Sequence, residues 1–91
     1  MKALIIDDEN KARKLISAII TDHCTEISSV YEASDLEEGV ALIREQQPDI
    51  VFLDIEMPKY SGLQIAELLM THEMNFQLIF VTAYNEYAVQ A

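Results

Sequence analysis

The chain has 91 residues, 51% of them hydrophobic, which suffices for one domain with a core but leaves a large share of the surface exposed. Its 16 acidic and 6 basic residues give a formal net charge of −10 at pH 7. This charge argues against a nucleic-acid groove or an anionic membrane surface as a direct partner. If part of the negative charge is concentrated in one place, that place would attract a divalent cation.

Cys24 is the single cysteine, which excludes a disulfide framework and a CxxC metal or redox pair and fits a reducing cytosol. We expect it to be a buried, small apolar residue. The apolar run near Met1 is too short for a signal peptide, and no stretch approaches the length of a membrane span. We therefore predict a soluble, cytoplasmic protein that does not contact a membrane.

Residues 3–6 form an apolar run of the kind found in strands that are covered on both faces, and the acids Asp7, Asp8 and Glu9 follow it directly. Residues 10–23 have apolar side chains at helical spacing, so we predict a helix there, capped by its first residue or by an acid just before it. The apolar residues of this helix are Ala12, Leu15, Ile16, Ile19 and Ile20.

A short strand is predicted at residues 27–33. Ser34 and Glu37 then match a capping box, in which a hydroxyl and a carboxylate each satisfy a backbone N–H at the start of a helix. We expect this helix to end at Gln47, because the residue before a proline is disfavoured in the helical conformation.

The central feature of the sequence is the segment 49–54, an apolar run that ends at Asp54. The pattern predicts a buried parallel strand, and parallel sheets bind ligands at the carboxyl ends of their strands. Pro58 prevents the strand from continuing, and Gly62 suits a loop that bends sharply. Asp54 is therefore the leading candidate for a functional residue.

A second capping box at residues 61–64 predicts another helix, and residues 77–81 form a fourth buried strand that ends at Thr82. Residues 86–91 are expected to begin a further helix. The alternation of strands and helices predicts an α/β fold with a doubly wound parallel sheet. Right-handed crossovers then place the carboxyl ends of all strands on one edge of the sheet.

The acids that meet at this edge repel one another unless a cation neutralises them or one takes a proton. Mg²⁺ prefers oxygen ligands and fits such a site. We predict Asp8 and Asp54 as direct ligands of the metal, with the backbone carbonyl of Glu56 as a third and Asp7 acting through water. An ion there would align a phosphoryl donor with Asp54, and the Thr82 hydroxyl is short enough to bond a phosphoryl oxygen.

Simpler interpretations stay open for each residue taken alone. An acid at a strand end is commonly a solvated terminus or a helix cap, and a threonine such as Thr82 is commonly a cap. His23 and His72 have no metal-ligand spacing, and we interpret both as solvated surface residues. The joint pattern is what favours a functional site.

Together these residues resemble the receiver domain of a two-component response regulator. The resemblance rests on residues 5–9, on the pattern Asp54-x-x-Met57-Pro58-x-x-x-Gly62 and on residues 80–83, and it covers essentially the whole chain. Residues 54–58 and 82–89 further resemble receivers of the LytTR class, whose output is a DNA-binding domain and whose role is transcription regulation.

The resemblance implies a flavodoxin-like receiver fold, with residues 1–91 as a single, incomplete domain that lacks the fifth strand and the last helix. It implies that Asp54 accepts a phosphoryl group from a sensor histidine kinase and that Asp7 and Asp8 form an acidic pocket for Mg²⁺. Thr82 would then read the phosphate.

In the family, the positions of Glu56 and Tyr84 influence how long the phosphate survives. Family receivers also have a lysine at the end of the fifth strand that contacts the phosphate. Neither that strand nor that lysine is found in this sequence, so we expect weaker phosphorylation. Residues 78–81 would then form an exposed edge strand. We expect a homodimer through that edge, or a dimer that exchanges elements.

Two other functions stay open. A Mg²⁺-dependent phosphohydrolase also uses a strand-end aspartate as nucleophile and needs a second acid two positions on, where Glu56 stands; the Pro58 turn and the small chain argue against it. The other alternative is a receiver core that cannot be phosphorylated and acts only by dimerisation.

Overall fold

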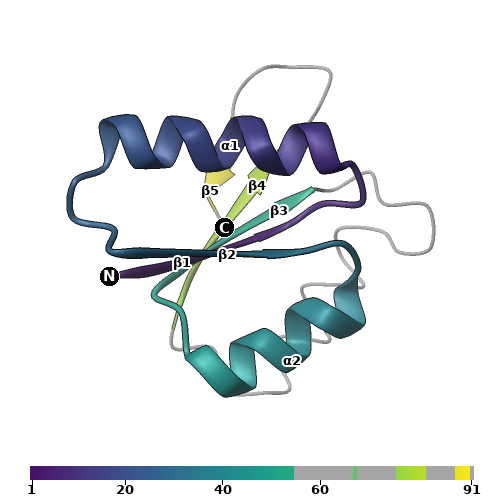
Figure 1. Ribbon diagram of the computed structural model, residues 1–91. Helices are drawn as coiled ribbons and strands as arrows, with labels where there is room; N and C mark the ends of the chain where they lie inside the picture. The colour runs from purple at the N-terminus through teal and green to yellow at the C-terminus, as the bar shows by residue number, and fades with distance from the viewer. Residues whose placement is uncertain (55–66, 68–75, 82–87, 91) are drawn as a thin grey trace.

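The computed structural model describes residues 1–54, 67, 76–81 and 88–90. Five strands form one sheet in the order β2-β1-β3-β4-β5. They are β1 (Lys2–Ile6), β2 (Ser29–Ala33), β3 (Ile50–Asp54), β4 (Gln77–Val81) and β5 (Ala88–Gln90). The helices α1 (Asn10–His23) and α2 (Leu36–Gln46) lie on opposite faces of this sheet (Figure 1).

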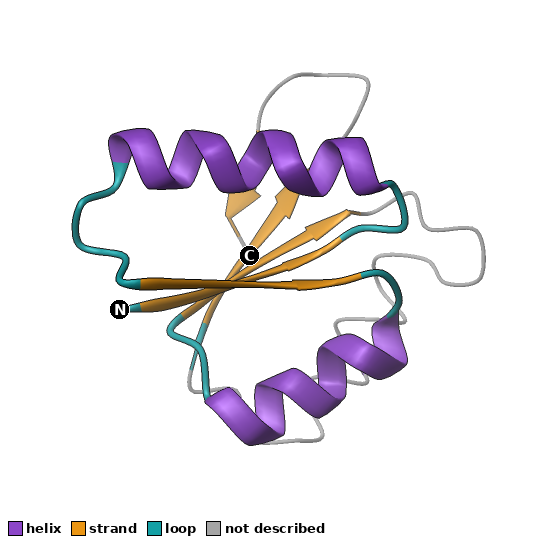
Figure 2. Ribbon diagram, viewed as in Figure 1, coloured by secondary structure: helices purple, strands orange, loops and turns teal. Residues whose placement is uncertain are grey.

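Strands β1 to β4 are all parallel, so the connections between them must cross a face of the sheet. Figure 2 shows the strands between the two helices, the arrangement expected of a doubly wound α/β sheet. The predicted fold class is therefore confirmed. The predicted bounds of the first helix, residues 10–23, and of the fourth strand, residues 77–81, agree with the observed elements.

The core lies mainly on the α2 side of the sheet. All four apolar residues of β1, from Ala3 to Ile6, have no exposed surface, as expected for a strand covered on both faces. Because side chains alternate along a strand, Leu4 and Ile6 face α2 while their neighbours face α1. The buried cluster on the α2 side consists of Leu4, Ile6, Ala33, Leu36, Val51, Leu53 and Leu78.

Helix α1 has a wider apolar face than the described part of the sheet covers. Ile20 is buried, whereas Leu15 is 63% exposed and Ile19 is 50% exposed. The helical spacing therefore predicted the helix correctly but did not show which of its apolar residues contact the sheet.

The N-terminus of α2 differs by one residue from the predicted capping box. Its N-cap is Asp35 rather than Ser34, and the Asp35 carboxylate accepts a hydrogen bond of 2.8 Å from the backbone N–H of Glu38. The Ser34 hydroxyl instead lies 3.4 Å from the Glu38 carboxylate. At the other end, Gln47 leaves the helix in the left-handed conformation, with φ of 47°, just before Pro48.

This cap predicts different effects for two neighbouring substitutions. We expect Asp35→Ala to lower the free energy of unfolding by about 1 kcal/mol, because it leaves the N–H of Glu38 without its acceptor. Ser34→Ala, the matched control, should change it by less than about 0.5 kcal/mol. Urea unfolding of both variants measures the difference, and the reverse order would restore the original assignment of the cap.

Gly39 allows α2 to pack closely on β1. A Cβ at this buried position would lie 2.5 Å from Ile6 Cδ1 and 2.9 Å from Ile6 Cγ1. Ile6 is itself fully buried, so its side chain has little room to move. We expect Gly39→Ala to destabilise the fold by about 1–2 kcal/mol, since overpacking outweighs the gain in helix propensity.

A second substitution tests this explanation. Ile6→Val removes the methyl group closest to the added Cβ, so the double variant should be more stable than the sum of the two single effects predicts. Additive effects in denaturant unfolding would show that the contact between Gly39 and Ile6 is not the cause.

Strand β5 corrects two predictions. Residues 88–90, expected to be the start of a helix, form a short strand antiparallel to β4, and the sheet therefore has a fifth strand. Ile79, Phe80 and Val81 of β4 pair with it, so β4 lies inside the sheet and not at its edge. A local pattern of three residues cannot distinguish a helix start from a strand that finds a partner. The proposed dimer through a β4 edge is therefore not supported.

Candidate functional site

The carboxyl ends of β1 and β3 lie side by side. Ile6, the last residue of β1, pairs with Leu53 in the parallel register. Asp7 follows Ile6, and Asp54, the last residue of β3, follows Leu53. Asp8 follows in the same loop as Asp7. The three carboxylates offer ligand oxygens that all lie within 4.8 Å of one another. The three acids therefore lie together at one edge of the sheet, as predicted.

The Asp7 side chain is held in a defined position. The residue is only 5% exposed, and its Oδ1 accepts a hydrogen bond of 2.9 Å from the backbone N–H of Glu9. Its own N–H donates to the carbonyl of Ala33 at 3.1 Å, which extends the pairing of β1 with β2 by one residue. Asp8 is exposed and Asp54 is partly buried, so the three acids differ in their access to water.

The pKa of Asp7 is raised from 3.8 to about 6, chiefly because the buried carboxylate loses hydration when it is charged. The hydrogen bond from Glu9 acts in the opposite direction and lowers the pKa. The negative charges of Asp54, Asp8 and Glu9 are smaller contributions to the same upward shift. Without a cation, the site therefore holds a carboxylate that is costly to ionise.

The donor set fits a hard divalent cation. All three side chains present carboxylate oxygens, the ligands that Mg²⁺ prefers, and the described residues around them add no soft ligand to this group. A cation would offset both the lost hydration and the repulsion between acids that together raise the pKa of Asp7. Exposure of Asp8 leaves one side of the group open to water and to an incoming substrate.

The remaining predicted site residues lie outside the described part of the chain. These are Glu56, Thr82 and Tyr84, together with the Pro58 turn and Gly62. The described backbone does bear on one of them, because Val81 pairs with Asp54 and Thr82 is the next residue after Val81. Of the helix predicted after Gly62, the structure describes Glu67, which is helical.

One residue close to this site was not predicted. Arg13 is not among the predicted site residues, yet its Nη1 donates a hydrogen bond of 2.7 Å to the backbone carbonyl of Asp7. Helical side chains lean toward the N-terminus of their helix, so a long cation in the first turns of α1 can reach the preceding loop. This direction is the sequence signal that would have indicated Arg13.

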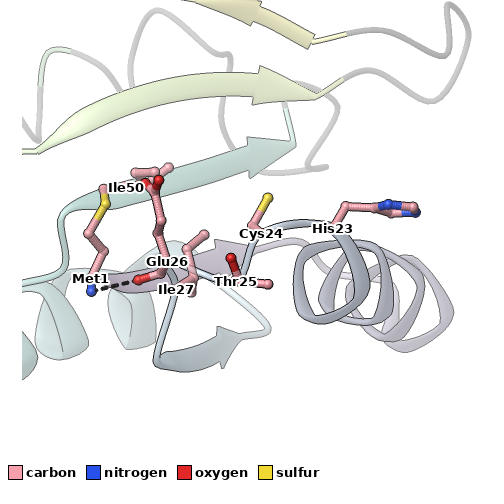
Figure 3. A pocket seen from close by; sticks show the side chains of 7 residues that line it. All are labelled: Met1, His23, Cys24, Thr25, Glu26, Ile27 and Ile50. Carbon is pink, nitrogen blue, oxygen red and sulfur yellow. Dashed lines mark hydrogen bonds between the residues drawn. The ribbon is translucent and has the colours of Figure 1, made fainter.

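The opposite edge of the sheet has a hollow of about 310 Å³ beside the end of α1. Figure 3 shows its lining, in which the Met1 ammonium donates a hydrogen bond to the Glu26 carbonyl and the His23 ring is directed away from Ile50. Cys24 is exposed here, so the prediction that it is buried is wrong. It follows the last residue of α1, in the loop that leads back to β2. His23 is exposed, as predicted.

The sequence matches the response regulator receiver domain family over residues 3–91. The chain belongs to this family. Receiver domains of response regulators act in two-component signalling, so the predicted resemblance is confirmed. Among the described residues, no helix is both long and apolar enough to cross a membrane.

Individual relatives agree with this assignment. The receiver is 42% identical to an uncharacterized response regulatory protein of Yersinia pestis and 38% identical to the sensory transduction protein LytT of Enterococcus faecalis. In both cases the whole chain is matched, but it spans only 37% of the relative's length. The similarity to LytT agrees with the expected LytTR class.

A solved structure shows the same fold. The response regulator receiver domain of Clostridium thermocellum superimposes with a TM-score of 0.76 at 28% sequence identity. The superposition covers 92% of this chain and 66% of the other chain. The receiver described here therefore corresponds to about two thirds of that structure.

Proposed function

We propose that this receiver is a phosphoacceptor module in which Asp54 takes a phosphoryl group from a sensor histidine kinase in a Mg²⁺-dependent reaction. The observation that carries this proposal is the group of three carboxylates within 4.8 Å at the carboxyl edge of the sheet. Asp54 is the member of the group at the very end of the central strand. Family membership supports the same role.

In this proposal Asp7, Asp8 and Asp54 hold the cation, and the backbone carbonyl of Glu56 completes the protein ligands. When bound, Mg²⁺ neutralises the acids and the charge of the phosphoryl group. The chain itself supplies the position of the acids, since the register of β1 and β3 places Asp7 and Asp54 side by side. The Asp7 carboxylate stays fixed through its hydrogen bond with Glu9.

The transfer step uses an oxygen of the Asp54 carboxylate as nucleophile. This oxygen forms a bond to phosphorus while the bond from phosphorus to the imidazole nitrogen of the kinase breaks, and the electron pair of that bond stays on the imidazole. The product on this chain is an acyl phosphate. The phosphoryl group carries about −1.5 to −2 charges, which replace the single negative charge of the carboxylate at the end of β3.

We propose that Thr82 detects this charge. Its hydroxyl would donate a hydrogen bond to a phosphoryl oxygen, and β4 is the element that such a movement would pull, because Val81 is paired with Asp54. Glu56 and Tyr84 are proposed to modulate the lifetime of the phosphate. The proposed output is a DNA-binding domain outside these 91 residues, which are then the receiver part of a cytoplasmic transcription regulator.

The test is intact-mass measurement of the chain after incubation with acetyl phosphate, with Mg²⁺ and with EDTA. We expect the mass of one phosphoryl group to be added in the presence of Mg²⁺ only, and the labelling to saturate at one group per chain. A folded chain that gains no mass would contradict the proposal. Continued release of phosphate without an adduct would indicate a phosphohydrolase instead.

A further inference from the structure

The Arg13 guanidinium joins three elements behind the acid site. Its Nη1 donates to the Asp7 carbonyl at 2.7 Å, and its Nη2 donates to Asn10 Oδ1 at 3.1 Å. Its Nε lies 3.5 Å from Glu32 Oε1 on β2. The Arg13 side chain is only 14% exposed, so these contacts are partly shielded from water.

Together with the contacts already described, Arg13 leaves the Asp7 peptide little freedom. The N–H of Asp7 is bonded to Ala33, its carboxylate to Glu9, and its carbonyl to Arg13. A bond between a charged donor and a carbonyl is stronger than a neutral one, and the planar guanidinium can hold several acceptors in one fixed arrangement. The orientation of the Asp7 carboxylate therefore depends on Arg13 through the backbone.

We propose that Arg13 is a positioning residue for the acid site, with Glu32 as its counter-charge. By holding the Asp7 carbonyl, it keeps the Asp7 carboxylate in reach of Asp8 and Asp54 and thereby sets the affinity of the site for a divalent cation. The inference rests on the proposed function, because it presupposes that the three acids bind such a cation. Removal of a group that orients a metal ligand typically weakens metal binding by about 10–100-fold.

Lys14 offers a matched control on the same helix. Its Nζ lies 3.1 Å from Glu32 Oε2, so it shares the counter-charge with Arg13, but its side chain is 66% exposed. Its ammonium donates a hydrogen bond to Glu32 Oε2, whereas the Asp7 carbonyl is bound by Arg13. Arg13→Gln and Lys14→Gln thus remove the same charge and each lose a contact with Glu32, whereas only the first frees the Asp7 carbonyl.

The experiment is a titration of the full 91-residue chain with Mn²⁺ alone, in which the electron paramagnetic resonance signal of the free ion gives the Kd. We expect Arg13→Gln to raise the Kd about tenfold. Lys14→Gln should change it by less than about twofold, as for an exposed ion pair. Arg13→Lys keeps the charge but loses the guanidinium fork, and its Kd should lie closer to that of Arg13→Gln than to that of the wild type.

Denaturant unfolding without metal separates positioning from stability. If Arg13 only stabilised the fold, its substitution would lower the free energy of unfolding while the folded fraction kept the wild-type Kd. Equal Kd values for Arg13→Gln, Lys14→Gln and the wild type would overturn the inference, and so would equal losses in the first two. If Arg13→Gln does not fold, Arg13→Lys decides by the same comparison. A wild-type chain that binds no Mn²⁺ would overturn the proposed function as well.

Discussion

Replacing Asp54 with asparagine is expected to abolish phosphoryl labelling of the chain by acetyl phosphate. The asparagine amide is neutral and its oxygen is a far weaker nucleophile than a carboxylate oxygen, so this side chain cannot form the acyl phosphate. The intact mass of Asp54→Asn should remain unchanged under conditions that label the wild type. The expected effect is a fall to the background level.

Asp22→Asn is the matched control for this variant. It makes the same chemical change at an exposed position near the end of α1. Its labelling should equal that of the wild type. Asp54→Asn itself should stay folded, because it removes one of the charges that repel Asp7. A phosphoryl group that still attaches to Asp54→Asn would place the acceptor on another residue.

Asp7→Asn is expected to stabilise the metal-free chain at pH 7.5 and to remove the stabilisation by Mg²⁺. The asparagine Oδ1 can still accept the hydrogen bond from Glu9, while the cost of burying a charge disappears. We expect a gain of about 1–3 kcal/mol in the free energy of unfolding with EDTA present. The same variant should show little further gain on addition of Mg²⁺, whereas the wild type should gain according to its affinity.

The raised pKa of Asp7 determines whether this residue stabilises or destabilises the folded chain at a given pH. The pKa of Asp7 is about 6 in the folded chain and 3.8 as its ordinary value, so between these two values the folded state binds more protons than the unfolded state. The contribution of Asp7 to stability is therefore fully present below pH 3.8 and is lost as the pH rises to about 6 and beyond. Mg²⁺ binding should weaken below about pH 6, because a proton then occupies Asp7.

Urea unfolding from pH 4.5 to pH 8, with EDTA or with Mg²⁺, measures both effects. We compare the free energy of unfolding of Asp7→Asn with that of the wild type at each pH. In this difference, the titration of acids that the substitution does not affect cancels. With EDTA, this difference should grow as the pH rises through 6 and then level off. An Asp7→Asn variant that is less stable than the wild type at pH 7.5 without metal would show that the charge of Asp7 is compensated by another group.

Features that depend on local pattern and on general rules of chain topology could be predicted from the amino-acid sequence. A strand that is covered on both faces has a continuous apolar run, whereas a helix that is covered on one face has apolar residues at helical spacing. These two patterns predicted β1 and the helix at residues 10–23. The meeting of Asp7, Asp8 and Asp54 followed because parallel strands joined by right-handed crossovers bring their carboxyl ends to one edge.

Features that depend on the spatial neighbours of a residue could not be predicted in this way. Asp35 and not Ser34 caps α2. Both side chains can accept a hydrogen bond from a backbone N–H, and the backbone conformation before the helix places the Asp35 carboxylate at the N–H of Glu38. Residues 88–90 form a strand because β4 offers them a partner. Leu15 and Cys24 are exposed although both are apolar, because no described element covers them.

The chemistry of the site shows the same division. The sequence supplied three acids and their place in the fold, but an acid becomes costly to ionise only when its surroundings exclude water. That exclusion, which raises the pKa of Asp7, and the hold of Arg13 on the Asp7 carbonyl both arise from packing between α1, β1 and β2. Residue types and order determined which groups meet at this edge, and packing determined their protonation and their freedom to move.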